Sequence, residues 1–192
     1  MSNYVLGCGS TVDLNEQHLK ERNVDVLPFH FRLGEKDYDD DFGKSIAYKD
    51  LYAEMAKGTP AKTSQTTAAE YEEKFTPVLE KGLDVVHVTL SSGISGSYGS
   101  CLIAKKTLEE KFPGRKVYVI DSLCASSGYG MLIDLAADYR DEGHSAAELA
   151  DYIEKTKLRI HHLFYSMDLS AYVRGGRVSQ TAGIIGSLLR IC

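Results

Sequence analysis

Short apolar runs alternate with stretches of helical spacing along most of this chain. Val85–Leu90 is rich in β-branched residues, as a buried strand is, and Tyr4–Leu6 and Val117–Ile120 resemble it. Between these runs, apolar residues recur every three or four positions, which predicts amphipathic helices. Strands separated by helices predict an α/β fold, with a parallel sheet flanked by helices and right-handed crossovers.

Several predicted helices have recognisable ends. Thr67 with Glu70, and Ser145 with Glu148, form capping boxes, each followed by an apolar stripe. Gly58 is a natural residue just beyond a helix end. We therefore expect helices that carry Leu51, Tyr52 and Met55, then Tyr71, Phe75, Val78 and Leu79, then Tyr129, Leu132, Ile133, Ala136 and Tyr139, and finally Leu149, Tyr152 and Ile153, with a short helix from Asp13 through Leu19.

The pattern is less regular between residues 24 and 66. Val24–Leu33 is predicted as one strand, which turns at Gly34 into a polar return through Tyr38. The acidic run Asp37–Asp41 lacks the spacing of a calcium loop, so it predicts a solvated hairpin edge. Pro60–Thr66 is interpreted as a polar loop.

The pattern changes after about Leu158. We expect an α/β domain over residues 1–158 and the start of a second α+β domain over 159–192. Within the latter we expect a strand at Ile160–Ser166, an amphipathic turn at Leu169–Val173 and a helix beginning near Ile184. The chain stops at Cys192 within an apolar stretch, so we expect the second domain to be truncated.

Composition narrows the class of protein. The chain has 192 residues, 43% of them hydrophobic, and a net charge of −5, which argues against a nucleic-acid surface. It contains neither an apolar run long enough for a membrane span nor an N-terminal signal peptide. Its four cysteines show no metal-ligand spacing, which favours free, mostly buried thiols. We expect a cytoplasmic protein.

Polar loops follow three predicted strands, at Gly9–Thr11, Ser91–Ser97 and Asp121–Ser127. Ligands of parallel sheets bind at this edge, and the helix that follows Ser95–Ser97 directs its N-terminal dipole there. Thr63, Ser95 and Ser97, with backbone N–H groups near Gly96, could hold a small carboxylate. Helix capping by Ser95 or Ser97 explains the same residues, and residue types alone leave both interpretations open.

The same loop admits other interpretations. Ser95 as the nucleophile of an esterase or acyl-transfer enzyme would need an activating base, yet Gly93–Ser97 misses the GxSxG motif and no His/Asp pair is evident. His87, inside an apolar strand, is predicted to be a core histidine with its hydrogen bonds satisfied. The glycine spacing matches neither a dinucleotide fingerprint nor a P-loop. A regulator that binds a small anion or phosphosugar remains an alternative.

With these residues in view, the chain resembles the DegV family of bacterial fatty-acid-binding proteins. The likeness is carried, in the family's order and over nearly the whole chain, by Ser10–Leu14, Thr63–Gln65, Leu90–Tyr98, Asp121-Ser122 with Ser126, and Gly175–Ser179.

The resemblance implies a two-domain protein that buries a long-chain fatty acid between its domains. The fatty acid carboxylate would be held by Thr63 and Ser95, with Gly96 and Ser97 at the same loop and Arg177 close by; Ser64, Ser10 and Arg174 are further candidates. Such proteins present the lipid to a separate ATP-using fatty acid kinase, so this chain would be a carrier and not an enzyme. No cofactor and no metal are implied.

The chain departs from the family pattern in two places. Gly9 stands where the family usually has Asp, just before Ser10-Thr11. Family members also continue beyond the position of Cys192, and a histidine that helps to hold the carboxylate would lie in that further part.

Overall fold

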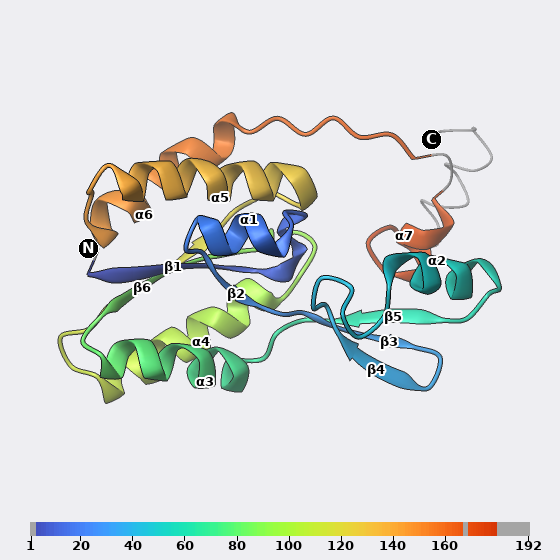
Figure 1. The fold of residues 1–192 in the computed structure, drawn as a ribbon, viewed down its shortest axis with the longest axis horizontal. Helices are drawn as coiled ribbons and strands as arrows, with labels where there is room; N and C mark the ends of the chain where they lie inside the picture. Colours follow the sequence, from blue (N-terminus) through green and yellow to red (C-terminus); the bar gives the residue numbers. More distant parts are fainter. Residues whose placement is uncertain (1–2, 167–168, 180–192) are drawn as a thin grey trace. The chain divides into compact units, whose positions relative to one another are not determined.

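A computed structural model describes residues 3–166 and 169–179. The chain divides into two compact units, Met1–His161 and His162–Cys192. The first unit contains two sheets and most of the helices (Figure 1). Among the described residues, no helix is long and apolar enough to cross a membrane.

The larger sheet is parallel and has four strands in the order β2-β1-β6-β7. These strands are β1 (Tyr4–Gly9), β2 (Asp25–Leu27), β6 (Asp84–Thr89) and β7 (Val117–Asp121). The register places Cys8 opposite Val88, and Thr89 opposite Asp121, so the strands end together at one edge. The predicted α/β fold with a parallel sheet flanked by helices is confirmed.

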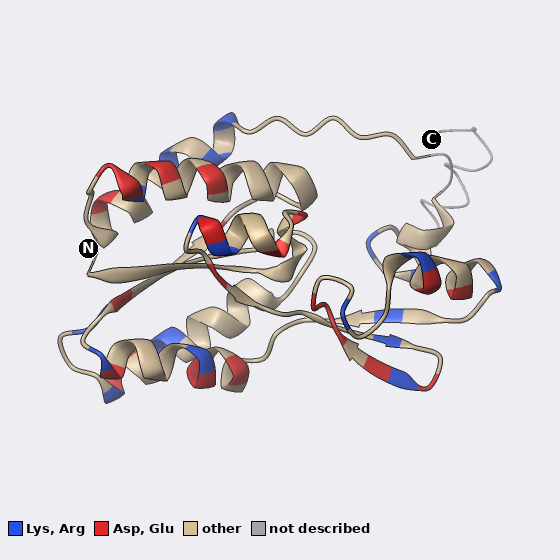
Figure 2. Ribbon diagram, viewed as in Figure 1, with Lys and Arg blue, Asp and Glu red and all other residues tan. Residues whose placement is uncertain are grey.

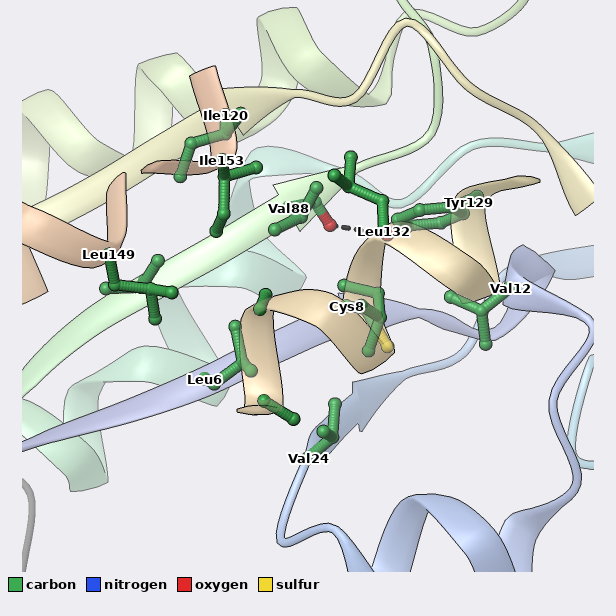
Figure 3. Packing of buried hydrophobic residues seen from close by; sticks show 14 of the residues in the cluster. Leu6, Cys8, Val12, Val24, Val88, Ile120, Tyr129, Leu132, Leu149 and Ile153 are labelled. Carbon is green, nitrogen blue, oxygen red and sulfur yellow. Dashed lines mark hydrogen bonds between the residues drawn. The ribbon is translucent and has the colours of Figure 1, made fainter. Parts of the chain in front are cut away.

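Helices cover both faces of this sheet (Figure 1). One face carries α1 (Glu16–Glu21), α5 (Ser126–Asp141) and α6 (Ala146–Thr156), and the other carries α3 (Ala68–Glu80) and α4 (Ser97–Lys111). Both predicted capping boxes are formed, at the starts of α3 and α6. Apolar residues of these helices pack on the strands, for example Leu132, Leu149 and Ile153 beside Leu6, Val88 and Ile120 (Figure 3).

A second, antiparallel sheet has the order β4-β3-β5, with β3 (His30–Leu33), β4 (Lys36–Asp39) and β5 (Ala61–Ser64). The expected hairpin edge is confirmed: Asp37 pairs with Arg32, Asp39 with His30, and Asp41 accepts the N–H groups of Lys44 and Ser45. Helix α2 (Tyr48–Ala56) follows, with Gly58 in the left-handed region just after it (φ +92°). All the residues of α2 are at least partly exposed.

The structure corrects three elements predicted between residues 13 and 66. Val24–Leu33 is two strands in different sheets, because Pro28 has no N–H to donate and breaks the ladder. Residues 61–64, expected as loop, form β5. The expected helix at Asp13 begins only at Glu16, since Asp13 is left-handed (φ +53°), and the turn before it is the 3-10 segment Ser10–Val12.

In the second unit, the structure describes residues 162–166 and 169–179. Residues 160–166, expected as a strand, have no regular secondary structure. The expected turn is a short helix, α7 (Ser170–Arg174). The predicted helix near Ile184 and the thiol of Cys192 lie outside the described residues.

Cysteines and a histidine are among the buried residues of the core. Cys8, Cys101 and Cys124 are free and buried, as predicted. His87 is buried as expected and meets the rings of Tyr71 and Phe75 at 5.3 and 5.2 Å. The expectation of satisfied hydrogen bonds was wrong, since neither ring nitrogen has a partner among the described residues. Burial, and secondarily Lys74, lowers the pKa of His87 to about 3, so the ring is neutral.

Candidate functional site

The C-terminal edge of the parallel sheet carries the three predicted polar loops. They follow β1, β6 and β7, the strands that end together there. In the loop after β6, the N–H groups of Ile94 and Ser95 donate to the carbonyl of Ser91 at 3.1 Å. The N–H of Ser97 donates to Ser95 Oγ at 3.2 Å. Because Ser95 Oγ accepts this bond, its own proton remains available for an acceptor on a ligand.

The loop after β7 supports the loop after β6. Asp121 Oδ1 accepts the N–H groups of Ser92 at 3.0 Å and Leu123 at 3.1 Å. The Ser91 N–H donates to the Cys124 carbonyl at 3.1 Å. A carboxylate that accepts two backbone N–H groups fixes both loops, so the position of Ser95 is defined by two strands rather than by one flexible turn.

Three non-glycine residues at this edge have left-handed backbones: Asp13, Leu123 and Ser126, with φ of +53°, +53° and +51°. Such conformations each cost on the order of 1–3 kcal/mol and gather at binding and catalytic sites. The Ser126 hydroxyl donates to the Asp13 carboxylate, which joins the loop after β1 to the start of α5.

Buried polar groups form hydrogen bonds at the end of β1 and in the loop that follows it. The Tyr129 hydroxyl accepts the Gly9 N–H at 3.0 Å and donates to the carbonyl of Val88. Ser10 is buried and its Oγ accepts the Phe29 N–H at 3.0 Å. A Cβ on Gly9 would lie 2.8 Å from the Phe29 ring. An aspartate at position 9 would therefore require this ring to move.

Thr63 and Ser64 lie on β5, exposed, and Gln65 connects this strand to the loop after β6. Gln65 Nε2 donates to Ser100 Oγ on α4 at 3.1 Å. The Gln65 side chain also lies over Gly96, where a Cβ would be 2.2 Å from Gln65 Oε1. The structure thus places Gln65, which directly follows Thr63 and Ser64, against Gly96 and Ser100, although a whole helix and strand separate them in the sequence.

Ser97 and Gly96 differ from Ser95 in their surroundings. Ser97 is fully buried beside the Tyr71 phenol, together with Thr66. Burial raises the pKa of Tyr71, so this phenol stays protonated. Gly96 immediately precedes α4, and its missing side chain leaves room for Gln65. Gln65 was not expected in the site, although its place directly after Thr63-Ser64 was an available signal.

The two candidate arginines belong to the second unit. Arg174 is the last residue of α7, and Arg177 follows Gly175 and Gly176. Gly176 is left-handed (φ +73°), and Arg177 Nη1 donates to the Gly175 carbonyl at 2.6 Å. Their participation in the site stays a prediction.

The DegV family, described as uncharacterised proteins, matches residues 8–192 of this chain. The chain belongs to the DegV family. A DegV domain-containing protein of Clostridium perfringens is 31% identical over 191 residues, which are 100% of this chain and 66% of that protein. The chain therefore spans just under two thirds of the length of this relative.

Two solved structures are also similar to the DegV chain described here. One, reported for fatty acid binding of a DegV family protein from Thermus thermophilus, has a TM-score of 0.81 and 27% identity, covering 97% of this chain and 64% of that one. The other is a fatty acid kinase B3 protein of Streptococcus pneumoniae loaded with linoleic acid. It has a TM-score of 0.77 at 21% identity, covers 100% of this chain and 66% of that one, and supports the fold alone.

Proposed function

We propose that this chain binds a long-chain fatty acid and presents its carboxylate to a separate fatty acid kinase, which forms the acyl phosphate. The observation that carries the proposal is the contact of Gln65 with Gly96 and Ser100, which joins the Thr63-Ser64 motif to the loop after β6. In parallel sheets, ligands bind at this edge. The fatty acid binding reported for the similar Thermus thermophilus protein supports the choice of ligand.

The proposed head-group site uses hydroxyls and backbone amides. Thr63 is exposed on β5, and Ser95 has a proton to donate. Buried carboxylates are costly unless they are hydrogen-bonded, and a bond to a charged group contributes about 1.5–3 kcal/mol. Arg177 would supply a further contact to the carboxylate, and Ser64, Ser10 and Arg174 are additional candidates for such contacts. The acyl tail supplies the affinity, because sixteen carbons offer roughly 11 kcal/mol gross on burial.

A carrier role is favoured over an enzymatic one by the surroundings of Ser95. A nucleophilic serine needs a base within hydrogen-bond reach. Among the described residues, the Ser97 N–H is the only hydrogen-bond partner of Ser95 Oγ, and it is a donor and not a base. His30 bonds to Asp39 and Glu70, and His87 is buried among aromatic rings. A fluorophosphonate probe should therefore leave Ser95 unlabelled, whereas labelling would support the esterase alternative.

The binding role is tested by titrating the chain with a fluorescent fatty acid. Thr63→Val and Ser95→Ala each remove one hydroxyl, so we expect affinity to fall about tenfold or more in each, equivalent to about 1.4 kcal/mol. Thr107→Val on the exposed surface of α4 is the matched control and should bind as the native chain does. Unchanged affinity in both site variants would contradict the assignment, and binding of only polar anions would favour the small-anion regulator.

The presentation role needs a second assay, in which the kinase is reconstituted with loaded carrier. Because Ser95 would contact the head group and not the tail, Ser95→Ala should lower phosphate transfer more than it lowers lipid retention. Equal losses of the two, or no loss of either, would count against the role of Ser95 in presentation.

A further inference from the structure

His30 on β3 lies between two carboxylates from different elements. Its Nδ1 is 2.9 Å from Asp39 Oδ1 on β4, and its Nε2 is 2.6 Å from Glu70 Oε1 in the first turn of α3. The ring thus joins the antiparallel sheet to a helix that packs on the parallel sheet. In the part of the chain that the structure describes, these two carboxylates are the charged groups that act on the ring. Figure 2 shows in red the acidic positions along the β3–β4 hairpin.

Both contacts require the charged form of the ring. A neutral imidazole has one N–H and one lone pair, whereas a carboxylate only accepts, so donating to both carboxylates takes the imidazolium. Partial burial opposes this charge, but the hydrogen bonds and charges of Asp39 and Glu70 outweigh it and raise the pKa of His30. When the ring loses its proton, one carboxylate faces a lone pair and that contact is lost.

The same contacts enclose the Thr63–Gln65 segment. In the ladder between β3 and β5, His30 is opposite Ser64, and Phe31 is opposite Thr63. At the other end, Glu70 Oε2 accepts the N–H and the hydroxyl of Thr67, both at 2.7 Å. Glu70 therefore holds the His30 ring with one oxygen and the start of α3 with the other, and the segment runs between these two anchors.

We propose that His30, bridging Asp39 and Glu70, is a positioning residue for the Thr63–Gln65 segment: this segment is held in place while the ring is charged and is released when the ring is neutral. The inference rests on the proposed function, because its consequence is for the fatty acid carboxylate. Binding is then strongest at pH values below the pKa of His30 and weakens as the pH rises through it.

The test compares fluorescent fatty acid binding at pH 6 and pH 8.5 in the native chain, His30→Gln and His18→Gln. His18 is the matched control, because it also pairs with a carboxylate, Asp134 at 2.7 Å, but between α1 and α5. All three proteins meet the same ligand at each pH, so ionisation of the fatty acid itself cancels.

We expect the native chain and His18→Gln to lose at least roughly fivefold in affinity at the higher pH, the lower end of typical couplings between sites. His30→Gln should bind weakly at both pH values. Glu70→Gln keeps a residue compatible with the capping box while removing the charge, and should also lose the pH dependence. A native pH profile in His30→Gln would overturn the proposal.

A second readout does not depend on the ligand. In an NMR titration of the native chain, the amides of Thr63, Ser64 and Gln65 should shift with the same pKa as the His30 ring, and in Glu70→Gln they should no longer follow it. Amides that ignore the ring would overturn the positioning role. If the amides follow the titration of the His30 ring in a chain that takes up no fatty acid at either pH, that result would support the positioning role and contradict the proposed ligand.

Discussion

At the C-terminal edge of the parallel sheet, close packing restricts which residue fits a position as much as chemistry does. Gly96 has an ordinary backbone (φ −79°), so its lack of a side chain reflects space and not conformation. That space is taken by the amide of Gln65, which also bonds Ser100. The contact between the two motifs therefore depends on the absence of one methyl group.

Gly96→Ala should separate binding from stability. The new Cβ would displace the end of a flexible side chain and break the Gln65–Ser100 bond, so we expect fatty acid affinity to fall severalfold while the free energy of unfolding changes by less than about 1 kcal/mol. Ligand titration and urea unfolding of the same preparation measure both quantities. Unchanged affinity would show that Gln65 need not lie over Gly96.

His87 predicts how stability depends on pH. Its pKa is lowered to about 3 in the folded chain, against an ordinary value of 6.5, so the unfolded chain takes up a proton that the folded chain excludes. Below about pH 6.5 the free energy of unfolding should fall with decreasing pH, by up to about 1.4 kcal/mol per unit from this group. His87→Leu should reduce that slope in urea unfolding between pH 7 and 4, and an identical slope would contradict the account.

At the scale of elements, helices begin close to the strand ends at the C-terminal edge of the parallel sheet. Helix α5 approaches the turn after β1 so closely that a Cβ on Gly130 would lie 2.5 Å from the carbonyl of Val12 and 2.9 Å from Leu14 Cγ. The first of these neighbours is backbone and cannot rotate away. The small residue thus sets how near α5 comes to the loop after β1.

Gly130→Ala should accordingly destabilise the fold by about 1–3 kcal/mol, the usual cost of overpacking. Gly99→Ala on α4 is the control, because its Cβ would meet nothing within 4 Å, and alanine favours a helix. The two variants are compared by thermal or urea unfolding. Equal stabilities would mean that α5 can move away from the turn without cost.

Part of this architecture could be predicted from the sequence. The parallel strands and capping boxes were predictable, because buried runs and N-terminal caps leave local patterns. Strand β5 could not be recognised, since all four of its residues are exposed and no apolar alternation marks it. The contact of Gln65 with Gly96 depends on the path of the chain through both sheets, which residue types alone do not record.

At the scale of the whole molecule, the DegV chain combines a parallel sheet with a smaller antiparallel sheet, and Gln65, just after strand β5 of the smaller sheet, bonds to Ser100 on α4. The Clostridium perfringens relative is longer than this chain, and it should hold lipid more tightly if its additional part encloses the acyl tail. Fatty acid titration of the two proteins measures the difference, and equal dissociation constants would contradict this expectation.

The most direct test of the account is native mass spectrometry of the freshly purified chain, with solvent extraction of any released ligand. We predict a mass increment that is released as a long-chain fatty acid, and its loss in Thr63→Val combined with Ser95→Ala. A bare protein that also takes up neither oleate nor palmitate would contradict the central claim.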